Sequence, residues 1–148
     1  MTDETTERVT YTADVVCIRE GEVLLITRGW PPHEGMLALP GGWVDPGETS
    51  LAAAVRELLE ETGVRVDAED LVLVGVYDDP DRDPRGRYVS AAYGVTVPAD
   101  TTARAGDDAA AVRWVPIDRL PRGLAFDHRR ILGDALSGQR AAAYVRRG

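Results

Sequence analysis

The sequence predicts an α/β layer fold of the α+β type, formed by one domain of packed strands and helices. Three observations support this prediction. The chain has 148 residues, a length that suits one compact domain with a buried core. Hydrophobic residues make up 44% and charged residues 28% of the chain, as in most globular proteins. Apolar runs of strand-like composition are mixed with two helical segments, without the strict alternation that indicates a parallel sheet.

The first half of the chain is expected to begin with a flexible tail and a β-hairpin. Residues 1–10 are polar and are assigned to the N-terminal tail. The range from about Ala13 to Arg28 holds two apolar runs around Glu20-Gly21, a pattern typical of a hairpin. The stretch from Gly29 to Gly47 is rich in glycine and proline. We expect an irregular loop with one short strand there, of the kind that often carries function.

The second half contains two predicted helices with strands between them. The first helix is expected from a cap at Thr49-Ser50 to about Thr62, and Gly63 suits the left-handed conformation at its C-terminus. The second helix runs from a cap at Asp127 to about Leu136. The charged segment Asp78–Arg87 is interpreted as a connector. Strands are expected at Val64–Val66, Leu71–Tyr77, Tyr88–Val97 and Val112–Val115.

Charge and hydropathy argue against several classes of function. The formal net charge of −8 at pH 7 argues against nucleic-acid binding, which depends on basic patches that neutralise phosphates. This charge permits a small phosphorylated substrate if a divalent cation lies between acid and phosphate. No apolar run approaches the roughly 20 residues that cross a bilayer, and the N-terminus lacks the apolar region of a signal peptide. We therefore expect a cytoplasmic protein without a membrane span, in which the single cysteine, Cys17, is a core residue.

The first predicted helix brings three carboxylates together. At about 100° per residue, Glu57, Glu60 and Glu61 share one face as i,i+3 and i,i+4 neighbours. Hard divalent cations prefer such oxygen ligands. Three glutamates alone are more often a solvated helix face, so the decision depends on the residues around them. A separate apolar stripe is expected to pack on the sheet and consists of Leu51, Val55, Leu58, Leu59 and Thr62.

The spacing of residues upstream and downstream of these glutamates is highly specific. A glycine is followed after five residues by Glu, and after seven more by Arg-Glu-aliphatic-any-Glu-Glu-any-Gly-aliphatic. The residues at these positions are Gly42, Glu48, Arg56, Glu57, Leu58, Glu60, Glu61, Gly63 and Val64. Every fixed position matches the Nudix box, and the chain resembles the Nudix hydrolases. The resemblance implies a Nudix-type α-β-α sandwich with a mixed β-sheet. We assign it to residues 11–140, before a C-terminal tail at 141–148.

The resemblance also implies roles for the residues of the box. In the family, the glutamate that matches Glu48 pairs with the arginine that matches Arg56 and holds the loop against the helix. Glu48 is also a candidate for a metal contact. The glutamates that match Glu57, Glu60 and Glu61 bind the metal, for which we expect Mg²⁺, with Mn²⁺ as the alternative. One of them, or an acid from a later loop, is expected to activate the attacking water, whose pKa the metal lowers.

Two further places are candidates to complete the metal site. Gly41 and Gly42 lack side chains, so their backbone can approach a phosphate or a metal closely, and the Gly42 carbonyl is a candidate ligand. Asp107 and Asp108 follow Gly106 in a region where the family often supplies a late acid. Asp108 is therefore a candidate metal ligand, and a plain surface turn is the alternative.

Two segments outside the box indicate a substrate. The connector Asp78–Arg87 with the strand after it, and the segment Leu124–His128, resemble ADP-ribose pyrophosphatases and the related regulators that sense ADP-ribose. Arginines can bind phosphate through paired hydrogen bonds. The candidate substrate-binding residues are Arg28, Arg82, Arg85, Arg87, Gly41 and Gly42. Alternatively, the connector arginines pair with Asp78, Asp79, Asp81 and Asp83.

The remaining aromatic and histidine residues leave two interpretations open. Trp30, Tyr77 and Phe126 are candidates for stacking on a base, or they belong to the core. His33 is interpreted as a loop residue and His128 as a residue at the start of a helix, with a role as general base as the alternative.

The predicted function is metal-dependent hydrolysis of a small nucleotide, converting ADP-ribose to AMP and ribose 5-phosphate. One alternative is a nucleoside triphosphate pyrophosphohydrolase. The other is a non-catalytic ADP-ribose sensor, although the dozen residues after Leu136 leave no room for the DNA-binding domain of such regulators. The expected partner is the nucleotide substrate, without nucleic acid or membrane. The resemblance also suggests a homodimer.

Overall fold

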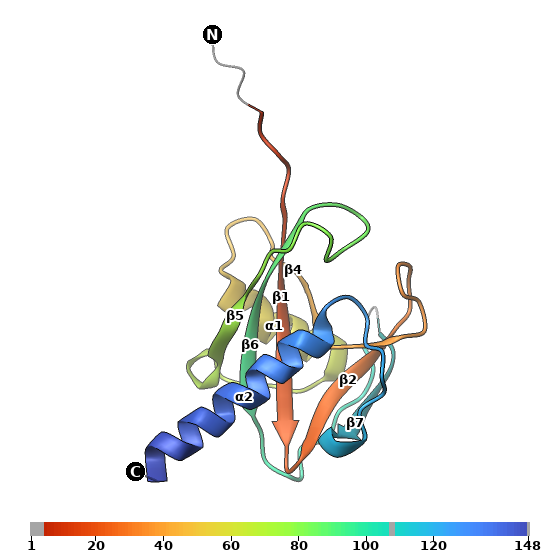
Figure 1. Ribbon diagram of the computed structural model, residues 1–148. Coiled ribbons are helices and arrows are strands. Elements are labelled where there is room, and N and C mark those ends of the chain that lie inside the picture. Colours follow the sequence, from red (N-terminus) through yellow and green to blue (C-terminus); the bar gives the residue numbers. More distant parts are fainter. Residues whose placement is uncertain (1–4, 107–108, 148) are drawn as a thin grey trace.

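The computed structural model describes residues 5–106 and 109–147 (Figure 1). Within these residues a seven-stranded mixed sheet lies between two α-helices, in agreement with the predicted fold class. The strands are β1 (Thr10–Arg19), β2 (Glu22–Arg28), β3 (Leu37–Ala38), β4 (Gly41–Trp43), β5 (Val72–Tyr77), β6 (Tyr88–Thr96) and β7 (Ala109–Pro116). The helices are α1 (Ser50–Thr62) and α2 (His128–Arg147), with 3-10 turns at Ala68–Asp70 and Ile117–Arg119.

Strand β1 is the centre of the sheet and changes partner along one edge. It pairs in parallel with β6 from Thr10 to Ile18. On its other edge it pairs with β4 through Thr12–Asp14, and with β2 only at Ile18–Arg19, next to the hairpin turn. Strand β2 pairs instead with β7 along its length. The sheet therefore opens between β1 and β2, and β4 enters this opening.

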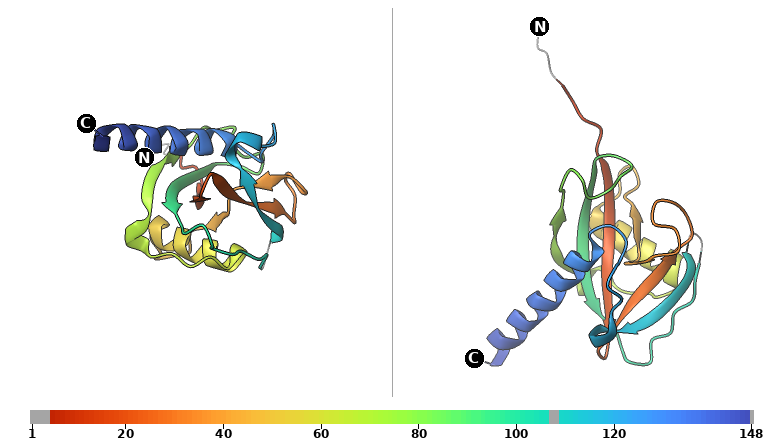
Figure 2. Two further views of the ribbon diagram at one scale, coloured as in Figure 1. Left: turned by 90° about the horizontal axis from the view of Figure 1, so that it is seen from below. Right: turned by 45° about the vertical axis from the view of Figure 1, so that its right-hand side comes forward.

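Two apolar layers cover the two faces of the sheet. Because side chains alternate along a strand, Ala13, Val15 and Cys17 of β1 pack toward α1, while Val16 and Ile18 pack toward α2. Figure 2 shows α1 and α2 on opposite sides of the sheet. The helix residues in these layers are Ala53, Ala54 and Leu58 of α1, and Ile131, Leu132 and Ala135 of α2. This is the predicted α-β-α sandwich.

Helix α1 begins and ends as its sequence predicts. The Thr49 hydroxyl accepts a hydrogen bond from the Ala52 N–H (3.1 Å), and Gly63 ends the helix with φ of 73°. The predicted apolar stripe is rotated, however: Leu58 and Thr62 are buried, but Leu59 is only half-buried. The other buried residues of α1 are Ala53, Ala54 and Glu61. The buried face of α1 therefore includes Glu61.

The structure corrects three element predictions. Val64–Val66 is not a strand: the Val64 N–H donates to the Thr62 hydroxyl (3.2 Å), and the alternating burial of its valines comes from packing against the α1 core. The Gly29–Gly47 stretch holds two short strands, β3 and β4, instead of one. The last strand and the last helix are longer than predicted, and α2 continues past Leu136 to Arg147.

The predicted hairpin is confirmed, as are the strands at β5 and β6 and the charged connector between them. Among the described residues, no helix is both long enough and apolar enough to cross a membrane.

Candidate active site

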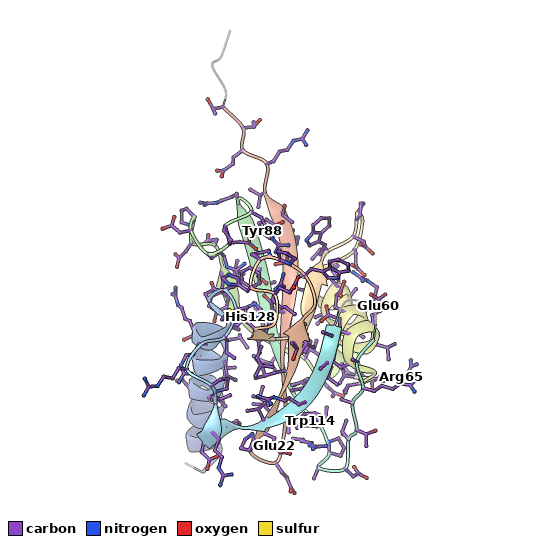
Figure 3. The ribbon with its side chains drawn as sticks, turned by 90° about the vertical axis from the view of Figure 1, so that its right-hand side faces the viewer. Glu22, Glu60, Arg65, Tyr88, Trp114 and His128 are labelled. Carbon is purple, nitrogen blue, oxygen red and sulfur yellow. The ribbon has the colours of Figure 1, made fainter. Side chains whose placement is uncertain are left out.

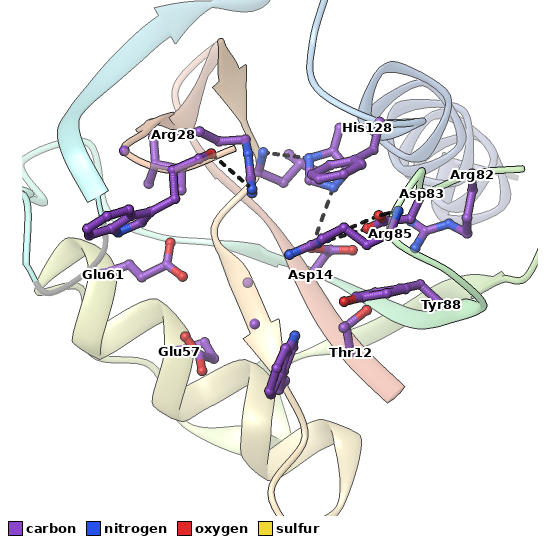
Figure 4. Close-up of a pocket in the computed structure, with 18 of the residues that line it drawn as sticks. Thr12, Asp14, Arg28, Glu57, Glu61, Arg82, Asp83, Arg85, Tyr88 and His128 are labelled. Atoms are coloured by element: carbon purple, nitrogen blue, oxygen red, sulfur yellow. Dashed lines mark hydrogen bonds and ion pairs between the residues drawn. The ribbon is translucent and has the colours of Figure 1, made fainter. Parts of the chain in front are cut away.

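A cavity of about 450 Å³ lies where the sheet opens between β1 and β2. Strand β4 and helix α1 border it on one side, and the 78–87 connector and the start of α2 border it on the other (Figure 4). This volume is in the range of small-molecule sites. The walls carry opposite charges. We call Glu57 and Glu61 the carboxylate wall, and Arg28, Arg82 and Arg85 the arginine wall.

The carboxylate wall consists of two glutamates one turn apart on α1. Glu61 is buried, and the Glu57 side chain is mostly buried. Burial raises the pKa of Glu57. The Arg56 guanidinium and a hydrogen bond with Glu61 lower this pKa, whereas the charge of Glu60 raises it further. The net effect is a raised pKa. Two close, partly dehydrated carboxyl groups are the environment in which a cation between them is stabilising.

Arg56 fixes the position of Glu57 from outside the pocket. Its Nε and one terminal nitrogen donate to the two carboxylate oxygens of Glu48, each at 2.9 Å, which is the contact that the family resemblance implies. The other terminal nitrogen donates to Glu57 at 2.9 Å and to Glu60 at 3.1 Å. The Arg56 side chain also donates to the Trp43 carbonyl at 2.9 Å, which ties α1 to β4. The hydrogen bonds with Arg56 are the main reason why the pKa of Glu48 falls to about 2.

One of the predicted metal ligands, Glu60, is not brought into this pocket. Glu60 has a side chain that is 42% exposed and points to Arg56, and it does not line the cavity. Figure 3 shows Glu60 on helix α1, away from His128 at the start of α2. Asp108, like Asp107, lies outside the described residues. Within the described ranges, no three His, Cys, Asp or Glu side chains form a ready metal-binding group.

The loop before Asp107 is packed on the C-terminal end of α1. The Gly106 N–H donates to the Glu61 carbonyl at 3.0 Å, and the Arg104 N–H donates to the Thr62 carbonyl at 2.9 Å. A Cβ atom at Gly106 would lie only 2.2 Å from the Glu60 carbonyl oxygen. The glycine is therefore required for this approach, and the loop is held beside the carboxylate wall.

The two glycines of β4 are required by close contacts with both acidic sides of the pocket. A Cβ atom on Gly42 would lie 2.5 Å from the Glu57 carboxyl carbon. A Cβ atom on Gly41 would lie 2.3 Å from the Ala13 carbonyl oxygen and 2.4 Å from Asp14 Oδ1. The absence of these side chains leaves the backbone of Gly41 and Gly42 open to the pocket, as their sequence position predicts.

The arginine wall is assembled from two segments and held by acidic and aromatic partners. Arg82, whose side chain is only 4% exposed, donates two hydrogen bonds to Asp127 (2.9 and 2.7 Å). Arg85 donates to both carboxylate oxygens of Asp83 (3.1 and 2.8 Å). The alternative that the connector arginines pair with connector aspartates therefore holds for Arg85 but not for Arg82, whose partner lies outside the connector. Arg87 does not line the cavity.

Arg28 and Arg85 lie close together around Phe126. Both guanidinium carbons are within 6 Å of the centre of the Phe126 ring, at 4.8 Å and 5.6 Å. Burial lowers the pKa of Arg28, and the like charge of Arg85 lowers it further, against the opposing pull of nearby acids. A bound anion between these two guanidinium groups would relieve that repulsion.

The aromatic candidates separate clearly. Trp30, which is 64% exposed, lines the pocket together with Phe126. Tyr77 does not line it: it is buried in the α2 core, and its hydroxyl donates to Asp134 (2.7 Å). The stacking alternative for Tyr77 is therefore wrong, and the core alternative is right. His33 contacts Phe126 edge-on from the loop after β2.

Several pocket residues were not singled out as site candidates in the sequence, most notably Asp14. Asp14 lies on the floor of the pocket between the two walls and is buried with His128 (Figure 4). His128 accepts a hydrogen bond from the Leu39 N–H at Nδ1 (3.0 Å). The sequence does contain an indication of this role. Asp14 is a charged residue inside the apolar run from Ala13 to Ile18, and charged residues are rarely buried unless they have a polar partner. Thr12, Asp83 and Tyr88 also line the cavity.

Comparison with known proteins agrees with this geometry. The NUDIX domain family profile matches residues 9–134, which include both walls of the pocket. The chain belongs to the Nudix hydrolase family. An ADP-ribose pyrophosphatase from Methanocaldococcus jannaschii is 42% identical over 121 residues, covering 82% of this Nudix hydrolase and 69% of that protein. A putative 8-oxo-dGTP diphosphatase from Bacillus subtilis is 36% identical over 131 residues, covering 87% and 81%.

Solved structures support the same family. A bifunctional NMN adenylyltransferase/ADP-ribose pyrophosphatase from Francisella tularensis, complexed with AMP and a manganese ion, superposes with a TM-score of 0.81 at 29% identity. The match covers 91% of this chain but only 43% of that one. Nudix hydrolases generally use divalent metal ions, and the carboxylate wall supplies the oxygen donors that such ions prefer.

Proposed function

We propose that this Nudix hydrolase cleaves a nucleoside diphosphate linked to a sugar, with ADP-ribose as the substrate and AMP and ribose 5-phosphate as products. The observation that carries the proposal is the pocket with a carboxylate wall facing an arginine wall. A diphosphate is anionic, so the arginine wall can bind it directly, whereas the carboxylate wall needs a cation in between. The 42% identity to an ADP-ribose pyrophosphatase supports the choice of substrate.

The residues of the carboxylate wall fit a hard divalent cation. Magnesium sites often use one or two carboxylates together with substrate phosphates, so Glu57 and Glu61 suffice as side-chain donors. The Gly42 carbonyl is a further candidate, because that residue touches Glu57 without a side chain between them. Glu60 and Asp108 stay candidate ligands from the sequence. When bound, a divalent cation lowers the pKa of water and neutralises phosphate charge.

The side chains of this chain then have distinct tasks. Arg28 and Arg85 bind phosphate oxygens, since a guanidinium can donate two parallel hydrogen bonds to one phosphate. Arg56 and Glu48 hold Glu57 in place, and a glutamate of α1 accepts the proton of the attacking water. The water oxygen bonds to one phosphorus while the bond from that phosphorus to the bridging oxygen breaks. Both products leave with a phosphate group.

A second function is favoured by one specific finding. The 36% identity to a protein named as a putative 8-oxo-dGTP diphosphatase supports hydrolysis of a nucleoside triphosphate in the same pocket. That reaction would release inorganic pyrophosphate and a nucleoside monophosphate. A non-catalytic ADP-ribose sensor is a third function, and it would bind ADP-ribose without turnover.

Product identification distinguishes these functions. The purified protein is incubated with ADP-ribose, other nucleoside diphosphate sugars, dinucleoside polyphosphates and nucleoside triphosphates, in Mg²⁺ and separately in Mn²⁺. AMP and ribose 5-phosphate from ADP-ribose, absent with Glu57→Gln, support the proposal. Pyrophosphate from triphosphates as the dominant product overturns the substrate, and ADP-ribose binding without turnover of any compound overturns catalysis.

Two further parts of the proposal concern the cell. We propose a cytoplasmic location, which rests on the polar N-terminus and the single core cysteine, and assembly into a homodimer, which rests on the family resemblance alone. Sedimentation velocity at micromolar concentration measures the assembly, and a monomer at all concentrations would contradict it.

A further inference from the structure

Asp14 is a buried carboxyl group in the pocket to which the proposed reaction gives no task. It lies on β1, between the two walls, and has a side chain that is only about one tenth exposed. Asp14 is not part of a three-residue metal-binding group among the described residues. A carboxyl group is costly to bury unless polar groups surround it, so its neighbours reveal what it can bind.

Two polar side chains next to Asp14, those of Ser90 and His128, each carry a hydrogen-bond donor that faces it. The Ser90 hydroxyl on the paired strand β6 donates to Asp14 Oδ2 at 2.5 Å. On the other side, the Leu39 N–H donates to His128 Nδ1, so in the neutral ring the proton is on Nε2. Burial lowers the pKa of His128, which favours that neutral ring, although the nearby Asp14 opposes the shift. Asp14 is therefore held as a hydrogen-bond acceptor.

One oxygen of Asp14 keeps capacity for a ligand. His128 Nε2 lies 3.6 Å from Oδ1, which is longer than a hydrogen bond. On the β4 side, the space next to Oδ1 is open because residue 41 is glycine, whose Cβ would lie 2.4 Å from this oxygen. A carboxylate oxygen accepts more than one hydrogen bond. Oδ1 can thus accept a hydrogen bond from a group inside the cavity.

The charge pattern restricts what that group is. Phosphate oxygens are acceptors and carry negative charge, so they belong at Arg28 and Arg85 and are repelled by Asp14. A sugar hydroxyl is neutral and donates a hydrogen bond, and in a nucleoside diphosphate sugar it is covalently attached near the phosphates. The pocket places an acceptor for hydroxyl groups next to donors for phosphate groups.

On this basis we propose that Asp14 Oδ1 binds a ribose hydroxyl of the substrate and so makes the enzyme selective for ribose over deoxyribose. The inference rests on the proposed function and adds a residue that determines which sugar is accepted. Ser90 is a positioning residue, because its hydroxyl holds the Asp14 carboxylate rather than touching the sugar.

The test measures kcat/KM for ADP-ribose and for four analogues that each lack one hydroxyl, at the 2 or 3 position of either ribose. For the wild-type enzyme, one analogue is expected to lose about 10- to 100-fold, the range for one hydrogen bond to a charged group. Asp14→Asn is expected to lose a similar factor on ADP-ribose and little more on that analogue. The identity of the analogue tells which of the two ribose units is bound.

Controls separate recognition from damage to the fold. Asp118→Asn makes the same chemical change at an exposed site outside the pocket and should leave all five kcat/KM values unchanged. Ser90→Ala keeps the carboxylate but removes the donor to Oδ2, and it should reduce the selectivity only in part. Thermal unfolding and calorimetric binding of ADP-ribose show whether each variant is folded and still binds.

Each outcome decides the inference. Equal loss by Asp14→Asn on all five substrates would show a purely structural role. Wild-type enzyme that accepts all five equally would overturn this inference and leave the proposed function intact. Wild-type protein that neither binds nor cleaves ADP-ribose would overturn both.

Discussion

The carboxylate wall and the arginine wall face the same cavity but are built differently. Glu57 and Glu61 come from one helix, and their spacing alone puts them one turn apart. Arg28, Arg82 and Arg85 come from β2 and the connector, and each contacts the segment before α2: Arg82 pairs with Asp127, while Arg28 and Arg85 lie against the Phe126 ring. The first wall is a local structure, whereas the second depends on long-range contacts. Substitutions in the first should therefore change the chemistry alone, and those in the second should change stability as well.

The largest effect is expected from Glu57→Gln. This variant keeps the shape of the side chain but removes a charge of the carboxylate wall, and kcat should fall by about three orders of magnitude, on the order of 4 kcal/mol. Glu60→Gln is the comparison on the same helix, because Glu60 is a candidate ligand from the sequence but is partly exposed and lies outside the cavity. Its kcat should fall far less, and equal losses in steady-state assays would contradict the division of α1 into inner and outer glutamates.

The next effect concerns the arginine wall, where stability is at stake. Arg82→Ala leaves Asp127 without its buried partner and should lower the free energy of unfolding by about 3–5 kcal/mol. Arg85→Ala should lose less stability, because the Arg85 side chain is 38% exposed, but should raise KM. Urea denaturation and steady-state kinetics measure both variants. Equal stability losses would show that the two ion pairs are equivalent.

A third prediction compares the two glycines between the walls. Gly41→Ala places a Cβ against the backbone oxygen of Ala13, which cannot move easily, so overpacking should cost about 1–3 kcal/mol. Gly42→Ala meets instead the end of the flexible Glu57 side chain. It should leave the melting temperature nearly unchanged while lowering kcat. If Gly42→Ala instead lowers the melting temperature while the folded molecules keep full activity, the close contact between residue 42 and Glu57 does not position the carboxylate wall.

The smallest effect is the pH dependence from His128. Its pKa is lowered below the ordinary value of 6.5 in the folded state, chiefly by burial, so the unfolded chain binds a proton more readily. The stability that this provides is present above pH 6.5 and is lost as the pH falls through that value toward the lowered pKa. Between about pH 7.5 and about pH 5.5, the melting temperature should fall less steeply with decreasing pH for His128→Gln than for the wild type. Parallel slopes would mean that His128 does not titrate with unfolding.

The comparison of the walls also explains which parts of the site could be predicted from the sequence. The helix from Thr49 to Gly63 and the Glu48–Arg56 contact depend on spacing along one element, so a linear pattern reveals them. The predicted strand at Val64–Val66 was wrong. Its alternating valines lie at the edge of the α1 core, and an alternating pattern of this kind looks the same in a sequence as a strand. The inward position of Glu61 and the outward position of Glu60 depend on how α1 is rotated against the sheet, which only the tertiary packing sets.

The sequence by itself determined the family, the mixed sandwich and the glutamates of the box, because these follow from residue type at fixed short spacing. Only the tertiary structure decided that Asp14, His128 and Phe126 share one cavity with Arg28. These residues lie on different strands and at the start of α2, and they meet because β1 and β2 diverge and β4 enters the opening. The physical reason is that a side chain's neighbours across a sheet are set by strand pairing and packing, which connect residues far apart in the chain.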